Sequence, residues 1–317
     1  MLAARVVMDQ GVEVVGVTFV MAFASRDTEK FKANVEEAAR GAGIPVRIED
    51  ISDRFLELVR SPRHGFGANM NPCIDCKILM LRSAKKMMKA EGADFVMTGE
   101  VLGERPMSQN RDALNTIKKY SELEGYLLRP LSAKLLDETV PEREGLVDRE
   151  KLLDLQGRSR KRQYELAKEY NLTKFFAPGG GCLLTDPIFV RKLKDLVAHD
   201  GRLDPDEIAL LKYGRHFRLD AKTKAVVGRD ERDNEELLNL KKDNDVVLRL
   251  QEKAGPYVIL RGDRSKGNIE KAASLALSHS KFRNGGDMTI EFWSKDGARD
   301  AVEAKPMTKD RIEKLRI

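Results

Sequence analysis

The sequence has few cysteines, few histidines and few aromatic residues, and these shortages narrow the class of protein. Three cysteines in 317 residues exclude a small scaffold held together by disulfides, and a chain of this length buries enough surface to need none. No stretch is apolar enough for a transmembrane helix, and the first residues lack the basic segment and apolar core of a signal peptide. We therefore expect a cytoplasmic protein without a membrane partner, whose cysteines are reduced ligands or nucleophiles.

Charged residues, in contrast, are abundant. They make up 34% of the chain against 6% for aromatic residues, and the formal net charge is +6. This mild basic bias permits a polyanionic partner without requiring one. The length indicates two domains.

The first half of the chain alternates short apolar runs with helical stretches. Strands are predicted at 12–19, 46–48, 94–98 and 126–128, and helices at 27–42, 51–60 and 72–90. This alternation predicts an α/β fold with a mainly parallel sheet and helices on both of its faces. Because ligands bind at the carboxyl ends of such strands, we expect a site near Thr18, near Thr98 and Gly99, and in the loop from 100 to 110.

The second half begins with a predicted basic helix at 148–170 and two helical patterns at 188–198 and 204–213. After residue 214 the pattern becomes that of a smaller α+β domain. Its predicted strands are 216–219, 225–227, 246–250, 257–260 and 288–293, and its predicted helices are 231–242 and 266–280. We expect the boundary between about 200 and 214, which gives domains at 1–200 and 201–317.

The three cysteines form a pair and a distant third. Cys73 and Cys76 share one face of the helix that we expect to start at Pro72, with Asn71 as its N-cap. In the first turn the helix dipole favours a thiolate, and Lys77 adds positive charge, so we expect lowered pKa values. The third, Cys182, follows three glycines, whose backbone can approach a ligand closely.

Three interpretations of these cysteines compete. The three thiolates could bind an iron–sulfur cluster with one iron left open. Alternatively, Cys76 and Cys182 could be a metal-free pair that carries a persulfide and then forms a disulfide. In the third, the cysteines are ordinary residues or part of a structural zinc site, which would need a fourth ligand such as His64. No histidine has metal-like spacing, so none is placed in the site.

The segment Asn71-Pro-Cys-Ile-Asp-Cys76, the strand ending at Thr98-Gly99 and the later Gly181-Cys182 resemble the tRNA 2-thiouridylases. These are PP-loop ATP-pyrophosphatases of the adenine nucleotide α-hydrolase-like, Rossmann-like fold, and the resemblance covers roughly 1–190. It implies catalysis by Cys76 and Cys182, and it implies a 4Fe–4S cluster on Cys73, Cys76 and Cys182, because cluster-containing members have a cysteine at the first of these positions.

The same resemblance implies that ATP and Mg²⁺ are cofactors and that tRNA and a sulfide or persulfide donor are partners. ATP would adenylate a uridine carbonyl, AMP would leave, and sulfur would take its place. Thr18, Thr98 and Gly99 would contact the nucleotide, and Arg105, Ser108 and Gln109 would lie near phosphate.

One departure from the family concerns its pyrophosphate-binding loop, Ser-Gly-Gly-x-Asp-Ser, which is not found here. Residues 2–11 look like the helix that follows that loop. We therefore expect a parallel sheet truncated at its N-terminal side. Either the start of the sequence is missing, which we favour because the rest keeps the family pattern, or the protein has lost ATP chemistry, in which case the polypeptide is inactive as it stands.

Two regions are candidates for RNA contact. The basic run at 157–163 has Arg158, Arg160, Lys161 and Arg162 for tRNA phosphates, or is a solvated face with Glu165 and Glu169 as neighbours. The stretches 227–234, 255–261 and 272–280 are similar to the RNA-binding domain of the NFACT ribosome-quality-control proteins. This similarity implies backbone contacts by Arg229, Asn234, Arg261 and Lys266.

These features together predict an ATP-dependent tRNA sulfurtransferase joined to an RNA-binding domain. Two other functions remain open at this point. One is a non-catalytic RNA-binding protein with a structural metal, and the other is a different PP-loop activity, such as amide formation.

Overall fold

The computed structural model describes residues 1–23, 28–172, 182–200, 203–295 and 297–317. The chain forms two compact units, Met1–Thr185 and Asp186–Ile317. The boundary predicted at 200/201 lies at the end of a helix of the second unit, α8 (Pro187–Asp200). No helix among the described residues is long and apolar enough to cross a membrane.

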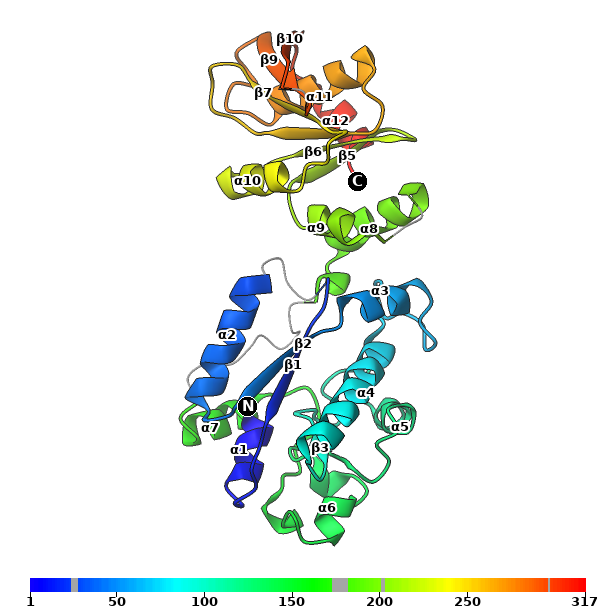
Figure 1. The fold of residues 1–317 in the computed structure, drawn as a ribbon, viewed down its shortest axis with the longest axis vertical. Coiled ribbons are helices and arrows are strands. Elements are labelled where there is room, and N and C mark those ends of the chain that lie inside the picture. The colour runs from blue at the N-terminus through cyan, green and yellow to red at the C-terminus, as the bar shows by residue number, and fades with distance from the viewer. Residues whose placement is uncertain (24–27, 173–181, 201–202, 296) are drawn as a thin grey trace. The chain divides into compact units, whose positions relative to one another are not determined.

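The first unit alternates helices with short strands (Figure 1). Its elements are α1 (Leu2–Met8), β1 (Gly16–Val20), α2 (Thr28–Gly41), β2 (Val46–Asp50), α3 (Ser52–Arg60), α4 (Cys73–Glu91), β3 (Val96–Met97), α5 (Arg111–Tyr120), β4 (Leu127–Leu128), α6 (Val140–Arg143) and α7 (Lys161–Glu169), with single 3-10 turns at Ala133–Leu135, Arg149–Lys151 and Leu183–Thr185.

Parallel pairing, as predicted, is present in this unit. β1 pairs with β2 from Gly16↔Val46 to Val20↔Asp50, and β3 pairs with β4. The α/β class is therefore confirmed. The described strands form two separate two-stranded sheets, however, and the single Rossmann-like sheet that the sequence predicts is not seen among them.

The predicted basic helix at 148–170 is wrong in its first half. A 3-10 turn at Arg149–Lys151 is followed by extended chain, and α7 begins only at Lys161. The reason is local pairing: Gln156 bridges to Leu102, the N–H of Gly157 donates to the Leu102 carbonyl at 2.7 Å, and Gly157 has a φ of +81°. A left-handed residue ends a helix and is easiest for glycine.

The second unit is an α+β domain, as predicted. Its elements are α8, α9 (Pro205–Leu211), β5 (Arg215–Asp220), β6 (Thr223–Val227), α10 (Glu231–Asn239), β7 (Val246–Leu250), β8 (Val258–Arg261), α11 (Lys266–Ser278), β9 (Met288–Trp293), β10 (Arg299–Ala304) and α12 (Lys309–Leu315). The strands form one sheet in the order β10-β9-β7-β8-β6-β5, with every pair antiparallel.

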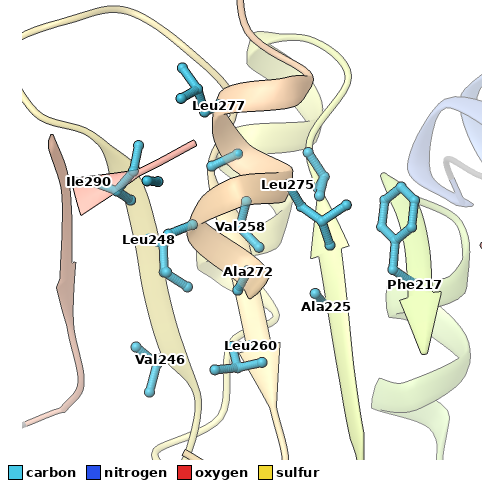
Figure 2. Close-up of a cluster of buried hydrophobic side chains, with 14 of the residues drawn as sticks. Phe217, Ala225, Val246, Leu248, Val258, Leu260, Ala272, Leu275, Leu277 and Ile290 are labelled. Carbon is cyan, nitrogen blue, oxygen red and sulfur yellow. The ribbon is translucent and has the colours of Figure 1, made fainter. Parts of the chain in front are cut away.

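Period-two alternation gives this sheet two different faces. One face packs against α11, where Ala272, Leu275 and Leu277 meet alternate strand residues (Figure 2). These strand residues include Phe217, Ala225, Val246, Leu248, Val258, Leu260 and Ile290. On the other face, Leu210 of α9 and Leu237 of α10 pack on strand residues Val226, Val247 and Ile259.

The outer edge of β5 is occupied by the last residues of the chain. Arg316 forms an antiparallel bridge with Phe217, and the N–H of Ile317 donates to the carbonyl of His216 at 3.1 Å. The Ile317 side chain is buried there.

Candidate functional site

The cysteine pair opens α4, but the cap differs from the predicted one. The N-cap is Pro72 and the first helical residue is Cys73, one residue later than expected. Asn71 therefore does not cap the helix. Its side-chain amide instead donates to the sulfur of Cys73 at 3.2 Å, and its Oδ1 accepts from the N–H of Asn69.

The structure brings the three cysteines into mutual electrostatic range. Each is partly buried and none is in a disulfide. Cys76 interacts electrostatically with both Cys73 and Cys182, and Cys182 also interacts with Cys73. Cys182 thus acts electrostatically on a thiol in the first turn of α4, although it is distant in the sequence. The Cys76 sulfur itself lies 3.7 Å from the sulfur of Met21.

The expectation of a lowered thiol pKa is wrong for Cys76. Burial raises the pKa of the Cys76 thiol to about 12, the neighbouring Cys182 and Cys73 raise it further, and Lys77 lowers it only in part. Burial also raises the pKa of Cys182, against a hydrogen bond from the Leu184 backbone. Desolvation here outweighs the helix dipole and the nearby lysine.

Metal binding requires several donor side chains that lie close together. In the parts of the chain that the structure describes, no three His, Cys, Asp or Glu side chains are grouped so that they could hold a metal ion. The cluster that the sequence predicts on Cys73, Cys76 and Cys182 therefore has no support among the described residues.

Lys77 lowers the pKa of the Cys76 thiol only in part, because its ammonium group is already paired with a carboxylate. Its ammonium group forms an ion pair with Glu100 and donates to the backbone carbonyl of Ser108 at 3.2 Å. The other carboxylate oxygen of Glu100 accepts from Arg129 at 2.9 Å and from the hydroxyl of Thr98 at 3.1 Å. This buried network joins α4 to the end of β3.

The pKa of Glu100 lies below its ordinary value. Burial alone raises it, but the charges and hydrogen bonds of Lys77 and Arg129 outweigh burial. Sequence reasoning missed this carboxylate. The available signal was its place two residues after Thr98, at the strand end where ligands were expected.

A second polar contact lies between the two cysteines on α4. The carboxylate of Asp75 accepts from the backbone N–H of His64 at 2.8 Å and lies 2.8 Å from the His64 Nδ1. The imidazole also packs against the Tyr120 ring, with 5.1 Å between centroids. This pair fastens the loop before α4 to the turn that holds the cysteines, a role that the sequence did not assign to His64.

The predicted nucleotide contacts lie at two strands. Thr18 pairs with Ile48 inside β1, which continues to Val20, so Thr18 is not the strand end. The N–H of Thr98 donates to the Leu128 carbonyl at 3.0 Å. An added Cβ at Gly99 would make only an ordinary contact, 3.9 Å from Ala3, so backbone there has room to meet a ligand.

The loop after Glu100 is packed rather than open. The side chains of Ser108 and Gln109 are buried, and the Gln109 Oε1 has no hydrogen-bond partner among the described residues. Arg105 acts electrostatically on Cys182 and lowers its pKa. Of the three residues expected near phosphate, Arg105 therefore contributes positive charge at the cysteines.

The basic run at 157–163 is only partly available to RNA. Arg160 pairs with Glu104 at 2.5 Å, and Arg162 pairs with Glu165 and Glu169 at 3.4 and 3.0 Å. Arg158 and Lys161 are exposed. A phosphate contact by the basic run at 157–163 would therefore rest on those two side chains.

Most of the polar residues expected to bind RNA in the second unit make structural contacts. Arg229 pairs with Asp233, with 2.8 Å between Nη2 and Oδ1. Arg261 is largely buried between Glu207 and Asp245. Asn234 joins α10 to the segment before β8 through the N–H of Tyr257. By contrast, the Lys266 side chain is 91% exposed.

Comparisons with known proteins agree with both resemblances. Residues 1–138 match the family model described as thiamine biosynthesis protein (ThiI). Residues 214–316 match the model described as NFACT protein RNA binding domain. The chain is thus similar to the PP-loop tRNA thiolation family in its first part and to the NFACT RNA-binding domain in its last part, the two resemblances that the sequence predicts.

Among curated proteins none matches the chain. A solved structure described as the C-terminal part of the fibronectin/fibrinogen-binding protein from Streptococcus suis is 16% identical over 89% of this chain and 100% of that chain, with a TM-score of 0.30. At that TM-score the likeness supports no argument about fold or function.

Proposed function

We propose that this protein takes part in the ATP-dependent transfer of sulfur to a uridine of tRNA. The observation that supports this best is the electrostatic interaction of Cys76 with both Cys73 and Cys182, in the unit whose residues 1–138 match a tRNA thiolation family. In this proposal residues 1–200 form a PP-loop ATPase-like domain with a Rossmann-like sheet, and residues 201–317 bind the RNA.

The chemistry requires activation and a sulfur donor. A uridine carbonyl oxygen is a poor leaving group, so ATP with Mg²⁺ would adenylate it with release of pyrophosphate, and AMP would then be the group that sulfur displaces. The backbone at Thr98 and Gly99 is the proposed contact for the nucleotide. The site acts mainly by holding the base and the sulfur in register.

For the sulfur step we propose a relay between the two thiols that sequence reasoning placed in catalysis. One cysteine holds the transferable sulfur as a persulfide received from a donor protein. Attack of the other thiol on the inner sulfur forms a Cys76–Cys182 disulfide and releases hydrosulfide, which displaces AMP from the uridine. An external thiol then reduces the disulfide.

The experiment is nucleoside mass spectrometry of tRNA from a strain that lacks the gene. We expect one thiouridine to be absent, to return with the intact gene, and to stay absent with Cys76→Ser or Cys182→Ser. Cys73→Ser is the matched variant. It retains thiolation in the relay and abolishes it if three thiolates bind a cluster, which an anaerobic preparation would show by its brown colour. Unchanged thiouridines in the deletion strain exclude the proposal.

The description of the matched family supports one further candidate, sulfur supply for thiamine biosynthesis. The same strain distinguishes it. Thiamine auxotrophy with normal thiouridines supports the thiamine function alone, and growth without thiamine contradicts it.

A further inference from the structure

One part of the second unit's sheet exposes side chains that the proposed function has not used. On β9, Ile290 and Phe292 point into the core under α11, so Thr289, Glu291 and Trp293 lie on the opposite face. The cluster under α9 and α10 on that face extends through Val247 and Ile259 to Tyr257 and Trp293, which are partly buried against it. Further along, over β9 and β10, the sheet is more open, and the Arg299 side chain is 58% exposed.

Aromatic rings and guanidinium groups alternate across this part of the sheet. The guanidinium carbon of Arg249 lies 5.9 Å from the ring centre of Tyr257 and 5.8 Å from that of Trp293. The guanidinium carbon of Arg299, directly opposite Trp293 on β10, lies 5.1 Å from the same ring. We call these four side chains, Tyr257, Arg249, Trp293 and Arg299, the aromatic–arginine row.

One carboxylate holds the row in place. Glu291 forms an ion pair with Arg249 through one oxygen and accepts from Arg299 through the other at 3.2 Å. A further hydrogen bond of 3.1 Å joins Arg249 to the Tyr257 hydroxyl. Two guanidinium groups share a single carboxylate, so one positive charge in the row is not compensated within it.

We propose that the aromatic–arginine row binds unpaired nucleotides of RNA. Bases stack on aromatic rings and on guanidinium planes, and the uncompensated charge attracts phosphate. Duplex RNA does not suit such a row, because its bases are already stacked on each other and present only edges and backbone. The proposal rests on the RNA-binding part of the proposed function and on the match of residues 214–316 to an RNA-binding domain.

The arginines that the sequence predicts as RNA contacts in this unit are already paired with carboxylates. Arg229 and Arg261 are held by carboxylates of their own unit, so neither is free to supply a new phosphate contact without breaking an ion pair. The row offers π surfaces and charge on the exposed part of the same sheet.

Trp293 provides a direct probe, since it is the only tryptophan in the 317 residues. We would titrate the full chain with a ten-nucleotide adenylate strand and, separately, with a duplex RNA of equal length. We expect the single strand to quench the Trp293 emission as it binds, and the duplex to bind more weakly with little quenching. Strong binding of the single strand with unchanged emission would overturn the proposal.

Variants measured with a labelled strand by fluorescence anisotropy complete the test. Trp293→Leu should weaken single-strand binding about tenfold, within the range expected for loss of one stacked base. Trp293→Phe should retain most of the affinity. Arg299→Ala should weaken binding and lower its salt dependence, whereas Arg311→Ala removes the same charge from α12, which packs by the opposite edge strand β5, and should have little effect.

Two results decide between this inference and the wider function. If Trp293→Leu, folded as judged by circular dichroism, binds the single strand as tightly as the original chain, the row is not the binding surface and the thiolation proposal is unaffected. If emission is quenched but the deletion strain keeps its thiouridines, the aromatic–arginine row binds single-stranded RNA and the thiolation proposal is wrong. Equal quenching and affinity for the duplex would also exclude base stacking.

Discussion

At the scale of single residues, Glu100 shows how the first unit accommodates a buried charge. A carboxylate loses much solvation free energy when it is buried, and the loss is offset only by close, well-placed partners. Glu100 has two cations, Lys77 and Arg129, and a hydroxyl from Thr98. Each partner comes from a different segment, so the network is also a link between those segments.

Removing the charge of Glu100 should therefore destabilise the protein. For Glu100→Gln we expect a loss of about 3 kcal/mol in the free energy of unfolding, because two buried cations lose their counter-ion. Urea unfolding followed by circular dichroism measures it. Glu122→Gln breaks an exposed pair with Lys85 and should change stability little. Equal stability of the two variants would contradict the role given to Glu100.

The same residue predicts a dependence of stability on pH. Because the pKa of Glu100 is lower in the folded state than in the unfolded chain, its contribution is complete above the unfolded value of about 4.3 and is lost as the pH falls through the folded value. The original chain should lose more stability between pH 5 and pH 3 than Glu100→Gln does. Parallel curves for the two proteins would show that Glu100 is not the titrating group.

The raised pKa of Cys76 predicts slow alkylation. With a pKa of about 12, roughly one thiol in ten thousand is ionised at pH 8, against about a quarter for an ordinary cysteine of pKa ~8.5. Peptide mapping after iodoacetamide treatment of the metal-free protein should find Cys76 unmodified at pH 8 and fully modified in urea. Modification at the same rate in both conditions would mean that burial does not control this thiol.

At the scale of elements, the apolar periodicity predicted most of the helices and strands. Errors arose where a segment forms backbone hydrogen bonds with residues that are distant in the sequence. The run from 148 to 170 contains good helix formers, yet Gly157 pairs with Leu102 and breaks it. Helix α5 was not predicted, although Asn110 caps it through the N–H of Ala113. These competing contacts are not local in the sequence, so periodicity alone does not reveal them.

The candidate site, like the helices and strands, was predictable where it depends on local sequence and not where it depends on distant contacts. The spacing of Cys73 and Cys76 and the glycines before Cys182 pointed to a shared site. The direction of the Cys76 pKa shift was not predictable, because it depends on burial and on Glu100 binding Lys77. The pairing of His64 with Asp75 likewise depends on how the loop before α4 folds back.

One glycine determines how β8 ends. Gly262 has a φ of +121°, and a Cβ added there would lie 2.2 Å from the carbonyl oxygen of Lys222. Gly262→Ala should therefore cost at least about 2 kcal/mol of stability through backbone strain and steric overlap. Thermal unfolding of the full chain measures it.

Gly267 in the first turn of α11 is the matched control, because no atom lies within 4 Å of an added Cβ there. Gly267→Ala should be neutral or stabilising by up to about 1 kcal/mol, since alanine restricts the unfolded chain. A similar loss in both variants would mean that the space around Gly262 is not the cause.

At the scale of the whole molecule, two described core clusters of the second unit consist of residues from that unit alone. The cluster under α11 and the one under α9 and α10 use only residues after Asp186. We expect a fragment of residues 186–317 to fold by itself with a single cooperative unfolding transition, measured by circular dichroism and by Trp293 emission. A broad, non-cooperative transition would show that the first unit is needed for its stability.

The closed edge of β5 has a consequence for handling this protein. An edge strand with unpaired backbone groups is a template on which another molecule can add a strand. Residues 316 and 317 already use part of that backbone, through the Arg316 bridge and the Ile317 bond to His216. Loss of these two residues would expose the edge, so aggregation of preparations that lack them is expected to begin there, by pairing between β5 strands.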